Sequence, residues 1–274
     1  MTPKTWFITG TSRGFGREWT IAALERGDRV AATARDAASL DDLVAAHGDA
    51  LLPITLDVTD RDAAFAAVAQ AHKHFGQLDV VINNAGYGHF GMVEELSEAE
   101  IRAQVETNLY GALWVTQAAL PFLRAQGSGH LIQVSSIGGI SAFPGIGAYH
   151  ASKWALEGLT QSLAAEVKDL GIAVTLVEPA GYSTDWSTAS AKHSDRLDAY
   201  DGVRDKAAEL RKKRQSSPGD PVATRAAILT LVDSPTPPLR IFFGDGPLAI
   251  ATADYEDRLA TWREWEPVSL AAHG

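Results

Sequence analysis

Short apolar runs alternate with amphipathic stretches along the first 180 residues of the chain. The apolar runs are continuous and rich in Val, Ile and Leu, which is typical of strands buried on both faces of a sheet. Six such runs lie at residues 5–9, 29–34, 51–56, 80–83, 130–134 and 172–178, and a seventh follows at 239–243. The pattern therefore predicts seven strands.

Helices are expected between these strands, and polar residues mark where two of them begin. Asp60 precedes an Ala-rich segment at 61–74, and Ser97 with Glu100 forms a capping box. Further helices are expected at 97–124, 149–170, 220–233 and 249–264. Strands joined by helices of this length require crossover connections. We therefore expect one α/β domain over residues 1–274, with a doubly wound, seven-stranded parallel sheet and helices on both faces.

The alternation stops after Glu178. Residues 182–217 are polar and lack sustained apolar periodicity. A stretch of that length without a strand is usually a disordered insert or a substrate lid. We expect a lid that is mobile without ligand and ordered with it, because lids exclude water from a reaction when they close.

Composition and charge narrow the possible partners. The chain has 274 residues, of which 34 are acidic and 24 basic, so its formal net charge is −10. A surface of that sign repels phosphate backbones and anionic lipids, so we expect neither nucleic acid nor a membrane as partner. The basic run at 211–214 is expected to be a solvated helical face.

The absence of cysteine excludes several kinds of site. Without cysteine there are no disulfides, thiolate nucleophiles or thiolate metal ligands. The histidines form no H-E-x-x-H pattern, so no metal site is expected. The first residues contain no long apolar stretch of the kind found in signal peptides, and we expect a cytoplasmic protein.

A glycine-rich run follows the first predicted strand and leads into a helix. It reads Thr9-Gly10-Thr11-Ser12-Arg13-Gly14-Phe15-Gly16. Glycines let the backbone turn sharply and approach a pyrophosphate, whose charge is then bound by the free amides of a helix N-terminus. Although the spacing is G-x-x-x-G-x-G rather than the commoner G-x-G-x-x-G, its place in the alternating pattern predicts a dinucleotide site.

Three residues farther along the chain are candidates for acid-base chemistry. Tyr149 and Lys153 are four residues apart at the start of a predicted helix, so their side chains leave the same face. Ser136 follows the fifth predicted strand, at the carboxyl edge where open parallel sheets bind ligands. A phenol of pKa about 10 needs its anion stabilised to act as a base near pH 7, and a neighbouring ammonium supplies much of that stabilisation.

These motifs resemble those of the short-chain dehydrogenases/reductases, a family of Rossmann-fold oxidoreductases, and occur in the family's order from Thr5 to about Thr184. The stretch at 83–86, Asn-Asn-Ala-Gly, is similar to the family's motif after the fourth strand. The resemblance implies a catalytic tetrad of Asn108, Ser136, Tyr149 and Lys153. It also implies a dinucleotide site formed by Gly10, Ser12, Arg13, Gly14, Phe15, Gly16, Arg35, Asp57, Val58, Asn84, Ala85, Gly86, Tyr149, Lys153, Pro179, Gly181 and Thr184.

The resemblance also implies roles for these residues. Tyr149 would transfer the proton, and Lys153 would lower the pKa of Tyr149 and hold the nicotinamide ribose. Ser136 would bond the substrate oxygen, and Asn108 would hold a water that relays protons. Thr184 would bond the nicotinamide carboxamide. The chain departs from the family at 180, where Ala replaces the usual Gly between Pro179 and Gly181.

The end of the second strand favours NADP(H) over NAD(H). The position that holds an acid in NAD-binding members is Ala34 here, and Arg35 follows it. An Arg offers the planar fork that suits a 2′-phosphate, and Arg13 stands where the family places another phosphate-binding cation. Asp36 is the contrary evidence, and we interpret it as the start of the following turn. NADP(H) is therefore the preferred cofactor, with NAD(H) possible.

The substrate is less well defined. Residues 84–91 and the long C-terminal extension look like the hydroxysteroid/retinol dehydrogenase-like branch. The cleft is expected to receive His89, Phe90, Phe143, Tyr182 and Trp186. Most of these are aromatic, which favours an apolar or ring-bearing ketone or secondary alcohol.

We therefore expect an NADP(H)-dependent oxidoreductase that interconverts a carbonyl and a secondary alcohol, with Tyr149 as general acid/base. The alternatives are an NAD-dependent secondary alcohol dehydrogenase and a dinucleotide-sensing regulatory protein. Because family members commonly pair through the helices predicted here at 97–124 and 149–170, we expect a homodimer or homotetramer. Small residues in these helices, among them Ala118, Ala119, Ala151, Ala155 and Gly158, would permit close approach.

Overall fold

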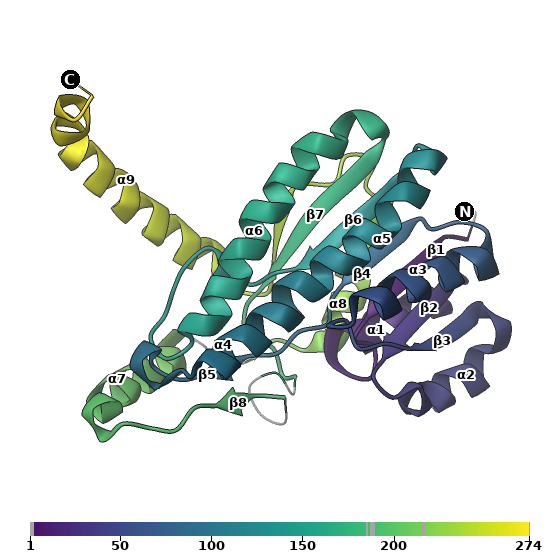
Figure 1. Cartoon of the computed structure of the whole chain (residues 1–274), viewed down its shortest axis with the longest axis horizontal. Helices are drawn as coiled ribbons and strands as arrows, with labels where there is room; N and C mark the ends of the chain where they lie inside the picture. Colours follow the sequence, from purple (N-terminus) through teal and green to yellow (C-terminus); the bar gives the residue numbers. More distant parts are fainter. Residues whose placement is uncertain (1–2, 185, 187–189, 215–217, 274) are drawn as a thin grey trace.

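A seven-stranded parallel sheet forms the centre of the molecule (Figure 1). The computed structural model describes residues 3–184, 186, 190–214 and 218–273. The strands are β1 (Thr5–Thr9), β2 (Arg29–Ala34), β3 (Leu51–Thr55), β4 (Val80–Asn83), β6 (Gly129–Val134), β7 (Ile172–Pro179) and β9 (Arg240–Phe243), in the order β3-β2-β1-β4-β6-β7-β9. Every neighbouring pair is parallel. The predicted Rossmann architecture is confirmed.

Helices cover both faces of this sheet, as the sequence predicts (Figure 1). On one face lie α1 (Gly14–Glu25), α2 (Asp41–His47) and α8 (Thr224–Asp233), and on the other α3 (Arg61–Phe75), α5 (Gly111–Gln126) and α6 (Gly147–Val167). Successive residues of a strand point to opposite faces. Trp6 and Ile8 accordingly belong to the core under the first set of helices, and Phe7 to the core under the second. All three side chains are fully buried.

The order of the strands reverses at β1, which lies between β2 and β4. The loops after β1 and β4 therefore leave the sheet in opposite directions and open a crevice at its carboxyl edge, where folds of this type bind ligands. Gly10 follows β1 and Asn84 follows β4. The topology thus brings two of the predicted motifs to one place.

Local capping fixes where several helices begin. The Asp60 carboxylate accepts from the amide of Ala63 at 2.9 Å, and the Ser97 hydroxyl accepts from the amide of Glu100 at 3.3 Å. The segment predicted as one helix over 97–124 is instead α4 (Glu98–Val105), a π-helical turn (Glu106–Tyr110) and α5. The π-helical turn carries Asn108, which is buried.

Part of the segment 182–217 has regular structure, of which the sequence predicted only a helical conformation at 211–214. The short strand β8 (Lys192–His193) pairs in parallel with β5 (His89–Phe90), and α7 (Asp201–Arg214) follows. Both lie together at one end of the molecule (Figure 1). Residues 185, 187–189 and 215–217 of the expected lid, and the side chains of the basic run at 211–214, lie outside the described part of the chain. The mobility of the lid remains a prediction.

The C-terminal helix α9 (Pro247–Ala271) is longer than the predicted 249–264 and runs away from the body (Figure 1). Pro247 starts it, consistent with the preference of proline for the first helical turn. Trp262 and Trp265 are each 59% exposed, because no other described element covers the outer part of this helix. No helix in the described part of the chain is long and apolar enough to cross a membrane.

Candidate functional site

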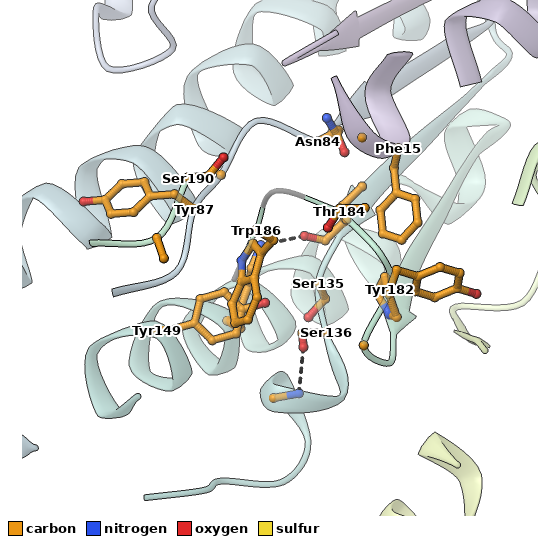
Figure 2. A pocket seen from close by; sticks show the side chains of 18 of the residues that line it. Phe15, Asn84, Tyr87, Ser135, Ser136, Tyr149, Tyr182, Thr184, Trp186 and Ser190 are labelled. Atoms are coloured by element: carbon orange, nitrogen blue, oxygen red, sulfur yellow. Dashed lines mark hydrogen bonds between the residues drawn. The ribbon is translucent and has the colours of Figure 1, made fainter. Parts of the chain in front are cut away.

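A cavity of ≈ 1340 Å³ opens at the carboxyl edge of the sheet (Figure 2). It extends from the turn after β1, past the ends of β2, β4 and β6, to the residues that follow β7. Most of the predicted cofactor residues line it: Gly10, Ser12, Arg13, Gly14, Phe15, Arg35, Asp57, Val58, Asn84, Ala85, Gly86, Tyr149, Lys153, Pro179, Gly181 and Thr184. Residues far apart in the sequence therefore share one cavity.

The glycine-rich turn has the backbone that the motif requires. Gly10 and Gly14 have φ of 69° and 59°, in the left-handed region that favours glycine. Gly16 is required for a different reason, because a Cβ there would lie 2.4 Å from the carbonyl oxygen of Gly10. The turn therefore brings the N-terminus of α1 against the cavity, where its unpaired amides can bind an anion.

Asn84 holds this turn to the loop after β4. Its Nδ2 donates to the carbonyl oxygens of Thr9 at 2.9 Å and Gly10 at 3.0 Å. The hydroxyl of Thr9 in turn accepts from the amides of Asn84 at 2.9 Å and Ala85 at 3.0 Å. Four hydrogen bonds thus fix the two loops on either side of the crevice relative to each other.

The end of the cavity near β2 and β3 is more open. Arg35 is exposed and lines it, next to the buried Ala34. Asp36 instead accepts from the amide of Ala38 at 3.0 Å and caps a short 3-10 helix, so its carboxylate begins the following turn. Asp57 lines the cavity, and its Oδ1 accepts from the amide and hydroxyl of Thr59 at 3.0 and 2.8 Å.

The residues at the centre of the cavity come from α6 and the end of β6. Tyr149 and Lys153 leave the same face of α6, and Lys153 Nζ lies 5.8 Å from the centre of the Tyr149 ring. Lys153 Nζ donates to the carbonyl oxygen of Val134 at 2.7 Å. Ser136 Oγ accepts from the amide of Gly138 at 2.9 Å, which orients the hydroxyl at the start of the next turn.

Burial perturbs both titratable groups at this centre. Desolvation raises the pKa of Tyr149 to about 12, although a hydrogen bond with Ser136 opposes the change. Desolvation lowers the pKa of Lys153 to about 8, and the charge of Glu157 opposes that change. Near pH 7 the phenol therefore keeps its proton, and Lys153 remains mostly charged.

Asn108 lies behind the cavity wall rather than in it. Its Oδ1 accepts from the amide of Tyr87 at 3.1 Å, and its Nδ2 donates to the Tyr87 carbonyl at 3.0 Å and to Ser152 Oγ at 3.2 Å. A Cβ at Gly86 would lie 3.1 Å from Asn108 Oδ1. The Asn108 amide thus fixes the backbone of the loop that follows the Asn-Asn-Ala-Gly motif.

Aromatic side chains cover the remaining side of the cavity. Figure 2 shows the indole of Trp186 over the ring of Tyr149, with the two ring centres 4.9 Å apart. Room for the indole depends on Gly88, where a Cβ would lie 2.6 Å from Trp186. Phe143 and Tyr182 also line the cavity.

Two residues expected in the substrate cleft, His89 and Phe90, lie outside the cavity lining. They form strand β5, whose pairing with β8 brings their side chains against that segment. His89 is 2% exposed and its Nε2 contacts Ser194 Oγ at 2.9 Å. The ring of Phe90 packs on His193 and against the edge-on ring of Trp186, with the Phe90 and Trp186 centres 5.6 Å apart.

The structure adds lining residues that the sequence did not indicate. Tyr87 directly follows the Asn-Asn-Ala-Gly motif, so its position along the chain could have suggested it. Ala207 and Leu210 come from α7, and Ile250 from α9. Their contribution depends on how these two helices pack, for which the sequence carries no local signal.

The departure at Ala180 causes no strain. Neither Ala180 nor Gly181 has a positive φ, so this loop does not need a second glycine. The amide of Ala180 donates to the carbonyl of Phe243 at 2.9 Å, and Gly181 O accepts from the amide of Gly219 at 3.0 Å. Thr184 follows in the cavity wall.

Comparison with known proteins identifies the family of the chain. Residues 4–195 match the family model described as short chain dehydrogenase. An oxidoreductase of Botryotinia fuckeliana is 41% identical over 271 residues, covering 98% of this chain and 99% of that protein. A short-chain dehydrogenase from Streptomyces avermitilis has a crystal structure with a TM-score of 0.91 and 39% identity, covering 99% of this chain and 98% of that chain.

A third comparison is more distant. An alcohol dehydrogenase from the archaeon Thermococcus sibiricus, solved in complex with 5-hydroxy-NADP, has a TM-score of 0.73 and 25% identity. The match covers 88% of this chain and 95% of that chain. Because the family model matches residues 4–195 and the two relatives above are 41% and 39% identical over nearly the whole chain, the chain belongs to the short-chain dehydrogenase family and is an oxidoreductase.

Proposed function

We propose that the protein interconverts a carbonyl compound and a secondary alcohol by hydride transfer with NADP(H), using Tyr149 as general acid/base. One observation carries the proposal: Tyr149, Lys153 and Ser136 line the same cavity as the glycine-rich turn at the N-terminus of α1. That arrangement places acid-base groups and an anion-binding turn along one continuous space.

The residues present fit a dinucleotide. The turn at Gly10 and Gly14 has the left-handed backbone that lets amides face a pyrophosphate, and Gly16 leaves no room for a side chain between α1 and that turn. Asp57 and Val58 line the part of the cavity proposed to hold the adenine, and Thr184 is available to bond the carboxamide. When bound, the cofactor supplies or accepts the hydride.

The chain's own residues would manage the proton and the substrate oxygen. Ser136 Oγ would donate to that oxygen, while Tyr149, which holds its proton near pH 7, would donate to the same atom as the carbonyl is reduced. The Lys153 ammonium would hold the ribose and stabilise the phenolate that remains. Asn108 would support this centre by fixing the Tyr87 backbone, and the water relay implied for it remains a prediction.

Tyr149→Phe tests the mechanism. The ring still packs against Trp186, but the hydroxyl is lost, so we expect dinucleotide affinity within about twofold of wild type and turnover reduced about a hundred- to ten-thousand-fold. A panel of ketones and secondary alcohols assayed with both cofactors first supplies a working substrate. Reduction of a good substrate at the wild-type rate by Tyr149→Phe would refute the assignment.

The preference for NADP(H) is supported by the two arginines that line the cavity, Arg13 and Arg35. Loss of one charged hydrogen bond typically costs about 1.5 to 3 kcal/mol, or roughly ten- to a hundred-and-fifty-fold in affinity. Arg35→Ala should therefore weaken NADPH binding by that factor and leave NADH binding nearly unchanged. Arg102→Ala is the matched control, because Arg102 pairs with Glu98 on the exposed side of α4. Equal wild-type affinity for NADPH and NADH would contradict the preference.

An NAD-dependent secondary alcohol dehydrogenase is the second candidate function. Its support was Asp36, but that carboxylate already caps the helix that begins at Ala37. A dinucleotide-sensing regulatory protein would not need an acid-base pair. Since Tyr149 and Lys153 are both in place beside the cavity, catalysis is the better-supported function.

The proposed substrate is apolar or ring-bearing. Trp186, Phe143, Tyr182 and Tyr87 all line the cavity, and aromatic walls favour flat apolar ligands over sugars or phosphorylated metabolites. Trp186→Ala should raise the KM of cyclic ketones more than that of short-chain ketones, since only the larger ligands would reach the indole. An equal change for both classes would remove Trp186 from the binding site.

We also propose a homodimer or homotetramer. Ala118 and Ala119 are buried in the protein's own core, so these two of the predicted small residues are not free to contact a second copy, and the pairing of the helices at 97–124 and 149–170 stays a prediction. On α6, however, Trp154 and Leu159 are each 38% exposed and Gly158 has nothing within 4 Å of its Cβ position. This outer face of α6 is proposed as the contact. Light scattering that gives 29.2 kDa at micromolar concentration would contradict it.

A further inference from the structure

A buried acidic cluster lies next to the catalytic centre and takes no part in the chemistry described above. Glu157 is on α6, one helical turn after Lys153, and Glu178 is at the end of β7. Their side chains are 7% and 1% exposed. Arg240 on β9 joins them, with its Nε 2.9 Å from Glu157 Oε2 and 3.5 Å from Glu178 Oε1. Two carboxyl groups therefore share one cation away from water.

The cluster is short of hydrogen-bond donors if both carboxyl groups are ionised. Glu157 Oε1 and both side-chain oxygens of Glu178 are buried without a donor among the described residues. Burying a second unpaired charge costs several kcal/mol, whereas a proton shared by the two carboxyl groups supplies the missing donor. Burial, followed by repulsion from Glu157, raises the pKa of Glu178 to about 8, while Arg240 opposes the change. Burial raises the pKa of Glu157 as well, but Arg240 Nε donates to Glu157 at 2.9 Å and lies 3.5 Å from Glu178, so the cation favours the ionised form of Glu157 and leaves the proton on Glu178.

This charge stands behind the groups that position the reaction. Gly139 lies between Ser135 and Glu157, since a Cβ there would be 2.7 Å from Ser135 Oγ and 3.0 Å from Glu157 Cγ. Ser135 stands between Val134 and Ser136 in the sequence. The Val134 carbonyl accepts the hydrogen bond from Lys153, and Ser136 is the proposed catalytic serine. The end of β6 accepts the hydrogen bond from Lys153, and the residues that follow it include Ser136. This segment therefore packs against the Glu157 side chain.

We propose that Glu157 is a positioning residue, whose negative charge keeps the buried Lys153 protonated at neutral pH while Glu178 remains its protonated partner. The charged and polar groups around Glu157 are Lys153 on α6, Ser135 after β6, Glu178 on β7 and Arg240 on β9, of which Arg240 donates a hydrogen bond to it. Lys153 has no other acidic residue acting on it among the described residues. The inference rests on the proposed function only where it concerns turnover.

The sign of the effect follows from the burial of Lys153. Desolvation favours the neutral amine, and a negative charge one turn away favours the ammonium. Removing that charge should lower the pKa of Lys153 by about 0.4 to 1.5 pH units, which is the range that Coulomb's law gives for two unit charges at a round separation of about 8 Å and an effective dielectric constant between that of water and about 20. The pH above which the reductive activity falls should decrease by the same amount.

Glu157→Gln and Glu178→Gln form the matched pair that tests this. Glutamine at 157 removes the charge, whereas glutamine at 178 reproduces the neutral, donating form proposed for that residue. NMR of protein labelled at lysine Cε measures the pKa of Lys153 without cofactor or substrate, with its signal assigned by its loss in Lys153→Met. We expect the lower pKa in Glu157→Gln and a pKa within about 0.3 units of wild type in Glu178→Gln. An unchanged Lys153 pKa in Glu157→Gln would overturn the inference.

Turnover and infrared measurements complete the test. If Glu157→Gln changes the pKa of Lys153 but not the pH above which activity falls, the positioning role is wrong. The proposed function is tested separately, and it stands if Tyr149→Phe loses turnover. The infrared band of a protonated buried carboxyl group is expected in wild type at pH 7 and should disappear in Glu178→Gln. This measurement does not depend on the folding of Glu157→Gln, and a wild-type protein without the band would overturn the shared-proton arrangement.

Discussion

Gly16→Ala is the substitution whose effect the structure defines most sharply. Gly16 is buried in the first turn of α1 and does not have a positive φ, so backbone conformation alone would accept alanine. The added Cβ, however, would lie 2.4 Å from the carbonyl oxygen of Gly10 and 2.5 Å from Asn84 Nδ2. The first neighbour is backbone, and the second is held by bonds to Thr9 and Gly10, so neither can move freely.

The magnitude comes from two opposing effects. Alanine is favoured over glycine inside a helix by about 1 kcal/mol. Overpacking a rigid site costs typically about 1 to 3 kcal/mol, and loss of each Asn84 hydrogen bond costs about 1 kcal/mol more. We therefore expect Gly16→Ala to lower the free energy of unfolding by about 1 to 3 kcal/mol. Because the displaced Gly10 belongs to the proposed pyrophosphate turn, NADPH affinity should fall at least tenfold.

Urea unfolding and fluorescence titration with NADPH measure the two quantities. Gly202→Ala is the control, since Gly202 is also helical, in α7, and nothing lies within 4 Å of its Cβ position. That variant should be as stable as wild type or slightly more stable, with unchanged NADPH affinity. The reasoning is refuted if Gly16→Ala matches Gly202→Ala in both measurements.

Two further predictions concern the lid and the core. Glu95 accepts from the amide of Leu197 at 2.8 Å and pairs with Arg204 at 2.6 Å, and so attaches the expected lid to the body. Glu95→Gln should therefore speed proteolysis at the lid residues Arg196, Arg204 and Lys206. Glu98→Gln is the control, because Glu98 lies on the exposed surface and its loss should not change the cleavage rate. These bonds lower the pKa of Glu95 to about 2, so the stabilisation that ionised Glu95 gives to the lid is complete above pH 4.5 and is lost as the pH falls towards 2. An unchanged cleavage rate in Glu95→Gln would contradict the role of Glu95 in attaching the lid. Burial lowers the pKa of His130 to about 4, so its contribution to stability is complete above pH 6.5 and is lost as the pH falls towards 4. Between pH 7 and pH 5 this loss amounts to about 2 kcal/mol for His130. Because burial also lowers the pKa of His89 and His150, urea unfolding should show a smaller loss in His130→Gln than in wild type, by about 2 kcal/mol, rather than no loss.

The sequence was sufficient for elements determined by local patterns. Buried strands and caps such as Asp60 and Ser97 depend on residues a few positions apart, and the predicted sheet follows from them. The glycine turn was predictable for the same reason, because the spacing of Gly10, Gly14 and Gly16 reflects backbone geometry within one turn.

Elements held by distant contacts could not be predicted in this way. Helix α7 is short of apolar residues, and Arg204 attaches it to Glu95, more than a hundred residues earlier. The strand pair that places His89 against Ser194 similarly joins two short segments, neither of which has a strand pattern of its own. The placement of substrate residues therefore depends on tertiary contacts, and the loop after β4 was the part of the site that sequence patterns located least well.

The opposing pKa changes of Tyr149 and Lys153 imply a difference between the two directions of the proposed reaction. Burial raises the pKa of the phenol to about 12, so loss of its proton at pH 7 would cost about 7 kcal/mol in the absence of other charges. Reduction needs the protonated phenol, which is already the stable form, whereas oxidation of an alcohol needs the phenolate. Oxidation therefore depends on the positive charge of Lys153, whose own burial acts against that charge. We therefore expect the resting protonation state at neutral pH to suit carbonyl reduction. The phenolate, which reduction would form and oxidation would start from, would depend in both directions on Lys153 and on Glu157 behind it.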